Sequence, residues 1–262
     1  REIPRLILEK NLYGLDIDDR AAQLAGFAVL MRARADDRRI LSRDDVTLNI
    51  MSIRGTRYMN AEDLAWKIVE GTDVNAELIV ELIKLFENAK TFGSLISVPG
   101  HLVEQLEVVS EVVNEKLQDE SWYANDAAAQ LSPILEQAAM LGRKYDCVVT
   151  NPPYMGNKGI NRALKAFLKN SYTSVKSDLF AAFIVRVIEM TKTEHFVGMM
   201  TPFNWMFLSS FEKLRDQMFE AATLTSLVRP EFHAFFDSAY VSVCGFSLQT
   251  KVMPYYKGSF ID

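Results

Sequence analysis

The 262-residue sequence lacks most features that mark fibrous, membrane-spanning or disordered chains. It has no repeat, no low-complexity tract and no apolar run approaching the length of about 18 residues that a membrane-spanning helix needs. Its charged share of 24% is average, which excludes disordered, collagen-like and coiled-coil classes. The net charge of −5 also excludes a generally basic surface, so a nucleic-acid partner requires a local basic patch or another part of the protein.

Cysteine is nearly absent, and Cys147 and Cys244 are too far apart to form a CxxC metal motif. Both lie in apolar, strand-like segments, where a free thiol packs as a small hydrophobic side chain. We therefore expect two buried, reduced cysteines, no metal site and a cytoplasmic location. The sequence has no signal-peptide pattern and begins at Arg1 without Met, which we interpret as the interior of a longer protein.

Apolar periodicity predicts alternating strands and helices. The predicted strands are 12–17, 46–50, 145–150, 196–200, 224–228 and 240–248. Predicted helices lie within 1–35, at about 178–192 and around 209–221, and residues 61–140 are mostly helical, with two apolar stripes. This alternation predicts the α/β fold class, with a mostly parallel sheet and helices on both faces.

The most specific motif is Asn151-Pro152-Pro153-Tyr154, which directly follows the predicted strand 145–150. Consecutive prolines fix the backbone and remove two donors, so this segment presents rigid carbonyls. The Asn151 side-chain oxygen and the Pro152 carbonyl could hold both hydrogens of an amino group, while Tyr154 stacks on a planar base or amide. The alternative is an Asn-Pro turn with a surface tyrosine.

Asp16 is a second candidate because it ends the first predicted strand. In doubly wound sheets, ligands bind beyond the carboxyl ends of the strands, and an acid there can accept hydrogen bonds from both hydroxyls of a ribose. The alternative is a helix cap. Asp18 and Asp19 lie where a helix N-terminus favours negative charge, so we expect these two to serve the following helix.

Both motifs resemble those of amino-group methyltransferases that use S-adenosylmethionine. Residues 145–154 resemble the catalytic motif, and residues 12–18 resemble the motif that binds the cofactor ribose. The resemblance implies a Rossmann-like class I methyltransferase fold in which Asp16 binds the ribose and Ile17 packs on the cofactor adenine.

The resemblance narrows at three further segments, 155–159, 176–180 and 204–215. They resemble the PglX-type adenine-specific DNA methyltransferases of BREX phage-defence systems and the related large restriction-modification methylases. This implies double-stranded DNA as substrate, other defence-system subunits as partners, and a flipped adenine whose N6 amino group is methylated without a metal. It also implies that Asp178 opens a helix beneath the cofactor methionine and the base.

A ring stacking on the flipped adenine opposite Tyr154 is implied at Phe236, with Phe235 as the second choice. The alternative for either phenylalanine is a core residue before a strand. The residue that contacts the cofactor's adenine amino group is harder to place, and Asn88 is the candidate.

Two departures from the family pattern are visible. No glycine-rich loop of the Asp-Pro-x-x-Gly-x-Gly kind precedes Asp16, so we expect this chain alone to bind the cofactor weakly or not at all, and to be inactive. Asp16 and Asn151 are 135 residues apart, more than a simple crossover needs. We therefore predict a methyltransferase core of residues 1–60 and 141–262, with a helical insertion at 61–140.

The segment between Gly156 and Ser177 has no acidic residue and five basic ones, which are Lys158, Arg162, Lys165, Lys169 and Lys176. We predict that Lys158, Arg162 and Lys165 contact DNA phosphates. The alternative is a solvated surface.

The sequence is also compatible with two other functions. The same tetrapeptide serves methyltransferases of RNA adenine or of a protein glutamine. A non-catalytic scaffold that keeps the fold is the other alternative, and the absence of the glycine-rich loop would fit it.

Overall fold

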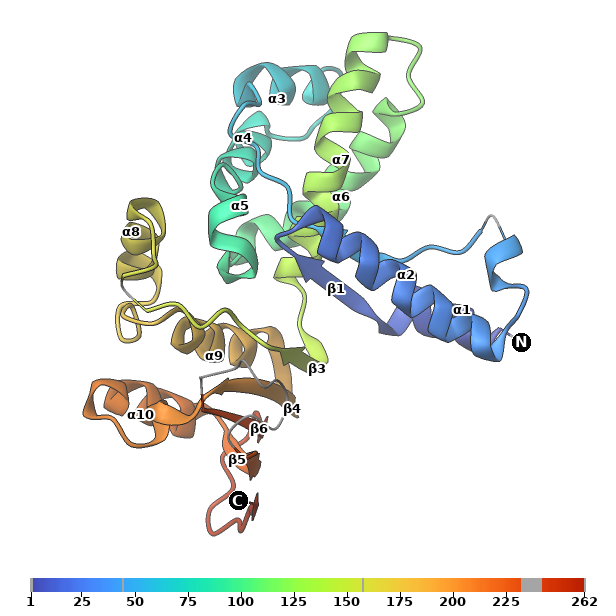
Figure 1. The fold of residues 1–262 in the computed structure, drawn as a ribbon. Coiled ribbons are helices and arrows are strands. Elements are labelled where there is room, and N and C mark those ends of the chain that lie inside the picture. Colours follow the sequence, from blue (N-terminus) through green and yellow to red (C-terminus); the bar gives the residue numbers. More distant parts are fainter. Residues whose placement is uncertain (1, 44, 157, 232–241, 262) are drawn as a thin grey trace. The chain divides into compact units, whose positions relative to one another are not determined.

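The computed structural model describes residues 2–43, 45–156, 158–231 and 242–261 (Figure 1). The chain divides into two compact units, Arg1–Gly142 and Arg143–Asp262. The division of residues 1–60, 61–140 and 141–262 into core and insertion stays a prediction.

Unit 1 begins with a helix, a two-stranded parallel sheet and the long helix between its strands. The elements are α1 (Ile3–Leu6), a π-helical turn (Ile7–Asn11), β1 (Tyr13–Asp16), α2 (Asp19–Asp36), a 3-10 turn (Ile40–Ser42) and β2 (Asn49–Ser52). The strands pair from Tyr13 with Asn49 to Asp16 with Ser52. Helix α2 packs on this pair, as expected of a crossover between parallel strands.

The strand predicted at 46–50 begins three residues later, at Asn49. Val46 and Leu48 instead pack on a small cluster of Leu8, Ala33 and Ile40. Asn49 Nδ2 donates to the carbonyls of Leu8 at 3.2 Å and Glu9 at 2.9 Å, which fixes the start of β2. An apolar run of this length cannot by itself distinguish a strand from a buried loop, because both bury the same side chains.

The rest of unit 1 is helical, as predicted. It contains α3 (Ala61–Val69), α4 (Ala76–Leu85), α5 (Ala89–Phe92), a 3-10 turn (Gly93–Leu95), α6 (Gly100–Lys116) and α7 (Trp122–Gly142). Asn60 and Asn75 cap α3 and α4 with their side-chain oxygens. Each predicted apolar stripe supplies buried residues, for example Ile68 and Ile83 from the first and Val113 from the second.

Unit 2 contains a five-stranded sheet. Its elements are β3 (Tyr145–Thr150), α8 (Arg162–Ser171), α9 (Leu179–Met190), β4 (Thr191–Pro202), 3-10 turns at Phe203–Met206 and Ser209–Phe211, α10 (Glu212–Ala221), β5 (Thr223–Val228), β6 (Val243–Gln249) and β7 (Ser259–Ile261). The strand order is β3-β4-β6-β5-β7. The pairs β3–β4 and β5–β7 are parallel, and β6 runs antiparallel to both neighbours. The predicted α/β class is confirmed, with a mixed sheet in this unit.

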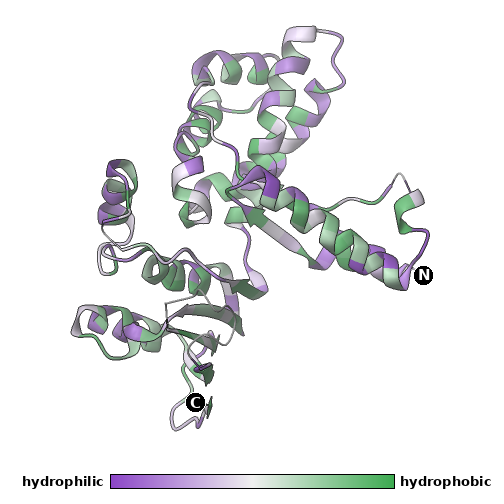
Figure 2. Ribbon diagram, in the orientation of Figure 1, coloured by the Kyte–Doolittle hydropathy of each residue, from purple (hydrophilic) through white to green (hydrophobic). Residues whose placement is uncertain are grey.

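Helices α9 and α10 cover one face of this sheet. Alternate residues of β6 (Cys244, Phe246 and Leu248) are buried, while α9 packs on β3 and β4 and α10 on β5. Figure 2 shows α9 as a largely apolar helix, in keeping with its buried position.

The expectation for Cys147 is wrong, because this thiol is exposed, whereas Cys244 is buried as predicted. Strand β3 lies at the end of the five-stranded order, and Val149, on the same face as Cys147, is 75% exposed. The apolar composition of this strand led us to expect a buried thiol, but burial depends on what covers each face of the sheet. Among the described residues, no helix is both long and apolar enough to cross a bilayer.

Candidate active site

The tetrapeptide Asn151–Tyr154 begins where β3 ends, beside the carboxyl end of the parallel strand β4. Thr150 pairs with Met199, three residues before β4 ends at Pro202, so both parallel strands end at the same edge of the sheet. Asn151 is exposed there, and Pro152 is buried. The rigid segment therefore presents the Asn151 side chain at the edge of the sheet where ligands of such folds bind.

Tyr154 turns back toward Asn151. Its hydroxyl donates to Asn151 Oδ1 at 2.8 Å and lies 3.3 Å from the Met200 carbonyl of β4. Burial raises the pKa of Tyr154, so the hydroxyl keeps its proton and remains a donor. The structure thus brings together the two residues that the sequence singled out, and it orients the Asn151 amide by a contact that the sequence motif did not reveal.

The backbone that Tyr154 contacts is held by a buried polar chain. Trp205 Nε1 donates to Thr201 Oγ1 at 3.1 Å, and Thr201 Oγ1 lies 3.8 Å from Cys244 Sγ. Burial raises the pKa of Cys244, so its thiol stays neutral. Sequence reasoning assigned Thr201 and Trp205 no role, although Thr201 directly follows the predicted strand 196–200, and it predicted only burial for Cys244.

Asp178 lies next to the same loop. It forms an isolated antiparallel bridge with Gly156, and the Leu179 amide donates to the Met155 carbonyl at 3.0 Å. The Asp178 side chain makes no capping bond to α9, and burial raises the pKa of its carboxyl. Asp178 is therefore placed beside Gly156, two residues beyond Tyr154, and its carboxylate does not cap the helix that it precedes.

Asp16 ends β1 in unit 1, where its carboxylate is exposed. Its Oδ1 accepts from the Asp18 amide at 2.8 Å, while Asp18 Oδ1 accepts from Arg20 and Ala21 and caps α2. The expectation that Asp18 serves the helix is confirmed. Because Asp18 is the cap, Asp16 is not, and its carboxylate retains acceptor capacity for the hydroxyls of a ribose.

Ile17, 42% exposed, is held from a distant part of unit 1. Lys90 Nζ donates to the Ile17 carbonyl at 3.0 Å and pairs with Asp19 Oδ1 at 2.6 Å, which lowers the pKa of Asp19. Gly93, with φ +57°, lies against Ile17, and a Cβ there would be 3.6 Å from Ile17 Cδ1. Glycine suits this backbone conformation, which other residues rarely adopt.

Asn88 directly precedes α5. Lys90 of this helix bonds to Ile17, and Gly93, which follows the helix, lies against the Ile17 side chain. The Asn88 carbonyl accepts from the Thr91 amide at 2.8 Å, and its side chain does not cap the helix. The structure therefore brings the segment of Asn88 to the strand end that carries Asp16 and Ile17. Sequence reasoning missed Lys90, whose role depends on this long-range contact.

The remaining candidates are placed as follows. Arg162 and Lys165 lie on α8, and Lys158 lies in the turn before it. Phe236 and Phe235 lie outside the described residues. Within the described ranges, no three His, Cys, Asp or Glu side chains are grouped to hold a metal ion.

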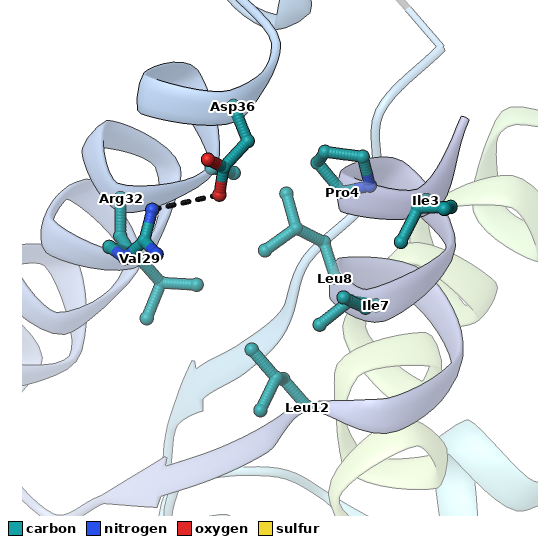
Figure 3. A pocket seen from close by; sticks show the side chains of 9 residues that line it. Ile3, Pro4, Ile7, Leu8, Leu12, Val29, Arg32 and Asp36 are labelled. Carbon is teal, nitrogen blue, oxygen red and sulfur yellow. Dashed lines mark hydrogen bonds and ion pairs between the residues drawn. The ribbon is translucent and has the colours of Figure 1, made fainter. Parts of the chain in front are cut away.

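A separate pocket of about 530 Å³ lies between the start of the chain and α2 (Figure 3). Leu8, Leu12 and Val29 are among its apolar lining residues, and Arg32 pairs with Asp36 at 2.8 Å at its rim. Leu12 precedes β1, whereas Asp16 ends it. This pocket therefore lies away from the candidate cofactor residues, and Arg32 and Asp36, the charged residues of its described lining, neutralise each other.

Residues 10–236 match the Eco57I restriction-modification methylase family. The chain belongs to this family. The resemblance found in the sequence motifs is thus confirmed, and the family match spans both Asp16 and the Asn151–Tyr154 loop.

Two curated relatives carry methyltransferase names. The chain is 40% identical over 255 residues to the adenine-specific methyltransferase BrxX of Escherichia coli O9:H4 (strain HS), covering 90% of this chain and 21% of BrxX. It is 31% identical over 222 residues to the adenine-specific methyltransferase PglX of Lacticaseibacillus casei (strain Zhang), covering 83% of this chain and 18% of PglX. The chain therefore spans about a fifth of the length of these relatives.

Among solved structures, a Listeria monocytogenes protein described as a class I S-adenosylmethionine-dependent methyltransferase aligns with 76% of this chain and 83% of its own. The sequence identity is 12% and the TM-score is 0.36. Similarity at this level does not define a shared fold.

Proposed function

We propose that this chain supplies the catalytic loop and the ribose-binding acid of an S-adenosylmethionine-dependent DNA methyltransferase that modifies the N6 amino group of adenine. The observation that supports this proposal most directly is the Asn151–Tyr154 loop at the carboxyl edge of the sheet, where the Asn151 amide is exposed and oriented by Tyr154. Both curated relatives are named adenine-specific methyltransferases, which supports adenine as the substrate base.

The cofactor fits the residues present in unit 1. Asp16 has an exposed carboxylate at a strand end, and the partly exposed Ile17 offers an aliphatic surface for a planar ring. We assign Asp16 to the ribose hydroxyls, Ile17 to the adenine ring, Asn88 to the adenine amino group and Asp178 to the cofactor's methionine end. S-adenosylmethionine supplies an electrophilic methyl group on a sulfonium when bound.

The chain's own residues act by positioning. Asn151 Oδ1 and the Pro152 carbonyl accept the two N6 hydrogens of an adenine rotated out of the duplex, so the nitrogen lone pair points away from them. Asn151 Oδ1 has a second lone pair besides the one used by Tyr154, so it can accept from both. Tyr154 and, by resemblance, Phe236 would stack on the two faces of the base. Fixed acceptors of this kind contribute orientation and electrostatic stabilisation without a metal or a covalent intermediate.

The proposed setting is a phage-defence or restriction-modification system, with double-stranded DNA as substrate and other defence subunits as partners. Because the substrate is cellular DNA, we place the activity in the cytoplasm.

The test uses the full-length protein. We expect Asn151→Ala to abolish N6-methyladenine formation on DNA while cofactor affinity, measured by calorimetry, stays nearly unchanged. Asn114→Ala, an exposed asparagine on α6, is the matched control and should remain active. Retained methylation in Asn151→Ala would refute the assignment. Parallel assays with RNA and with protein acceptors identify the substrate class, and transfer only to one of those would refute DNA.

A further inference from the structure

The segment that follows the catalytic loop leaves it after Gly156 and returns to it at Asp178. Gly156 bridges Asp178, and the Leu179 amide donates to the Met155 carbonyl at 3.0 Å. The two ends of the intervening excursion are therefore joined directly after Tyr154. We call residues 158–176 the basic arm. A Cβ at Gly156 would lie 3.2 Å from Asp178 Oδ1, so the junction is tightly packed.

The basic arm is also fixed along its length. Asn161 caps α8 by accepting from the Leu164 amide at 2.9 Å. Leu164 and Leu168 are buried on one side of the helix, and Ser174 Oγ donates to Gln217 of α10 at 2.9 Å. The arm is thus a packed element and not a loose loop, so its exposed side keeps a defined relation to the catalytic loop.

That exposed side is a basic stripe. Arg162, Lys165 and Lys169 stand at helical positions i, i+3 and i+7, which share one face of α8. All three are exposed, as is Ala166 between them, opposite the buried leucines. Figure 2 shows hydrophilic residues along this helix. Lys158 lies in the preceding turn, outside the stripe.

The stripe carries uncompensated charge. The arm has no acidic residue, and no described carboxylate forms an ion pair with Arg162, Lys165 or Lys169. Elsewhere lysines are paired, as Lys192 is with Asp146 at 2.9 Å. A row of exposed, unpaired cations within a chain of net charge −5 is a local anion-binding surface.

We propose that Arg162, Lys165 and Lys169 bind successive phosphates of one DNA strand beside the base that enters the Asn151–Tyr154 loop. This inference rests on the proposed function, which makes DNA the ligand. It adds to that function the residues that contact the duplex. Seven residues of α helix rise about 10 Å, which corresponds to about three phosphate-to-phosphate steps along one strand, at about 3.4 Å of axial rise each. Such contacts fix the position of the duplex and carry no sequence specificity.

The experiment compares full-length proteins on a fluorescently labelled duplex of random sequence, measured by anisotropy over a range of salt concentrations. In Arg162→Gln/Lys165→Gln/Lys169→Gln we expect affinity to fall at least about tenfold and the slope of log affinity against log salt to become shallower by about 2 to 3. The matched control, Lys10→Gln/Arg34→Gln/Arg38→Gln, removes the same charge from exposed positions of unit 1 and should change neither value.

A charge-preserving variant, Arg162→Lys/Lys165→Arg/Lys169→Arg, separates charge from folding and should bind as the parent does. The proposal is overturned if the glutamine variant keeps its affinity and salt slope, if the control loses as much, or if the charge-preserving variant binds as poorly as the glutamine variant. Failure of the proposed function is distinguished by methylation at low salt and saturating DNA. There a parent protein that forms no N6-methyladenine would refute the proposed function itself, whereas the comparison of affinities and salt slopes tests the stripe independently of catalysis.

Discussion

Replacing Gln137 should lower the free energy of unfolding of unit 1, which carries the candidate cofactor residues. Gln137 of α7 is fully buried (0% exposed), and it pairs with both backbone groups of Arg54. Its Oε1 accepts from the Arg54 amide at 2.7 Å, and its Nε2 donates to the Arg54 carbonyl at 3.0 Å. Arg54 follows Ile53, whose amide donates to the Asp16 carbonyl at 2.8 Å. The glutamine therefore ties the end of β2, and through it the end of β1, to the helical part of unit 1.

Gln137→Leu keeps the side-chain volume and removes both hydrogen bonds. Each lost bond is worth about 1 kcal/mol net, and each backbone group left unpaired away from water adds about 1 to 3 kcal/mol. Because the Arg54 residue is itself exposed, water can reach part of its backbone, so we expect a total near 2 to 4 kcal/mol.

The assay is urea unfolding of the chain followed by far-ultraviolet circular dichroism, with the midpoint falling at an unchanged slope. Gln130→Leu is the matched control, since Gln130 lies on the same helix but is exposed and donates to the exposed Asp126 at 2.7 Å. It should change stability by no more than about 0.5 kcal/mol. A Gln137→Leu protein as stable as Gln130→Leu would refute the reasoning.

Three further predictions concern unit 2. Tyr154→Phe keeps the ring but loses the bond to Asn151 Oδ1. Single-turnover methylation by the full-length protein should therefore slow by less than about tenfold, and loss as complete as in Asn151→Ala would contradict this. Burial raises the pKa of Asp178, so its ionisation opposes folding as pH rises above the unfolded value of about 3.9. Asp178→Asn should thus unfold at a higher temperature near neutral pH, an advantage that disappears in acid, while cofactor affinity falls. Burial also raises the pKa of Tyr172, so stability should fall as pH rises above about 10, and Tyr172→Phe should flatten that alkaline slope in unfolding titrations.

Features encoded by neighbouring residues were predicted correctly from the sequence. The helical character of residues 61–140 follows from apolar side chains at helical spacing, and β3 follows from an apolar run that ends at a proline pair. Asp18 caps α2 through contacts only two and three residues along the chain, at 2.8 and 2.9 Å. Family membership was likewise visible in short motifs, because the chemistry of Asn151–Tyr154 depends on adjacent residues.

Contacts between distant residues were not predictable in the same way. Lys90 reaches Asp19 across 71 residues, and Gln137 reaches Arg54 across 83. Neither pairing leaves a local pattern, since any polar side chain at those positions is equally compatible with its own helix. The exposure of Cys147 was missed for the same reason, because composition fixes that a strand is apolar and not which face is covered.

The sequence by itself therefore determined most of the helices and strands, the catalytic tetrapeptide and the excess of basic residues after it. Tertiary structure alone decided that Tyr154 orients Asn151, that Lys90 holds Ile17, and that the bridge from Gly156 to Asp178 joins the basic arm to the catalytic loop. The physical reason is that periodicity and capping act over a few residues, whereas the direction of a side chain and the partner it meets depend on the path of the whole chain.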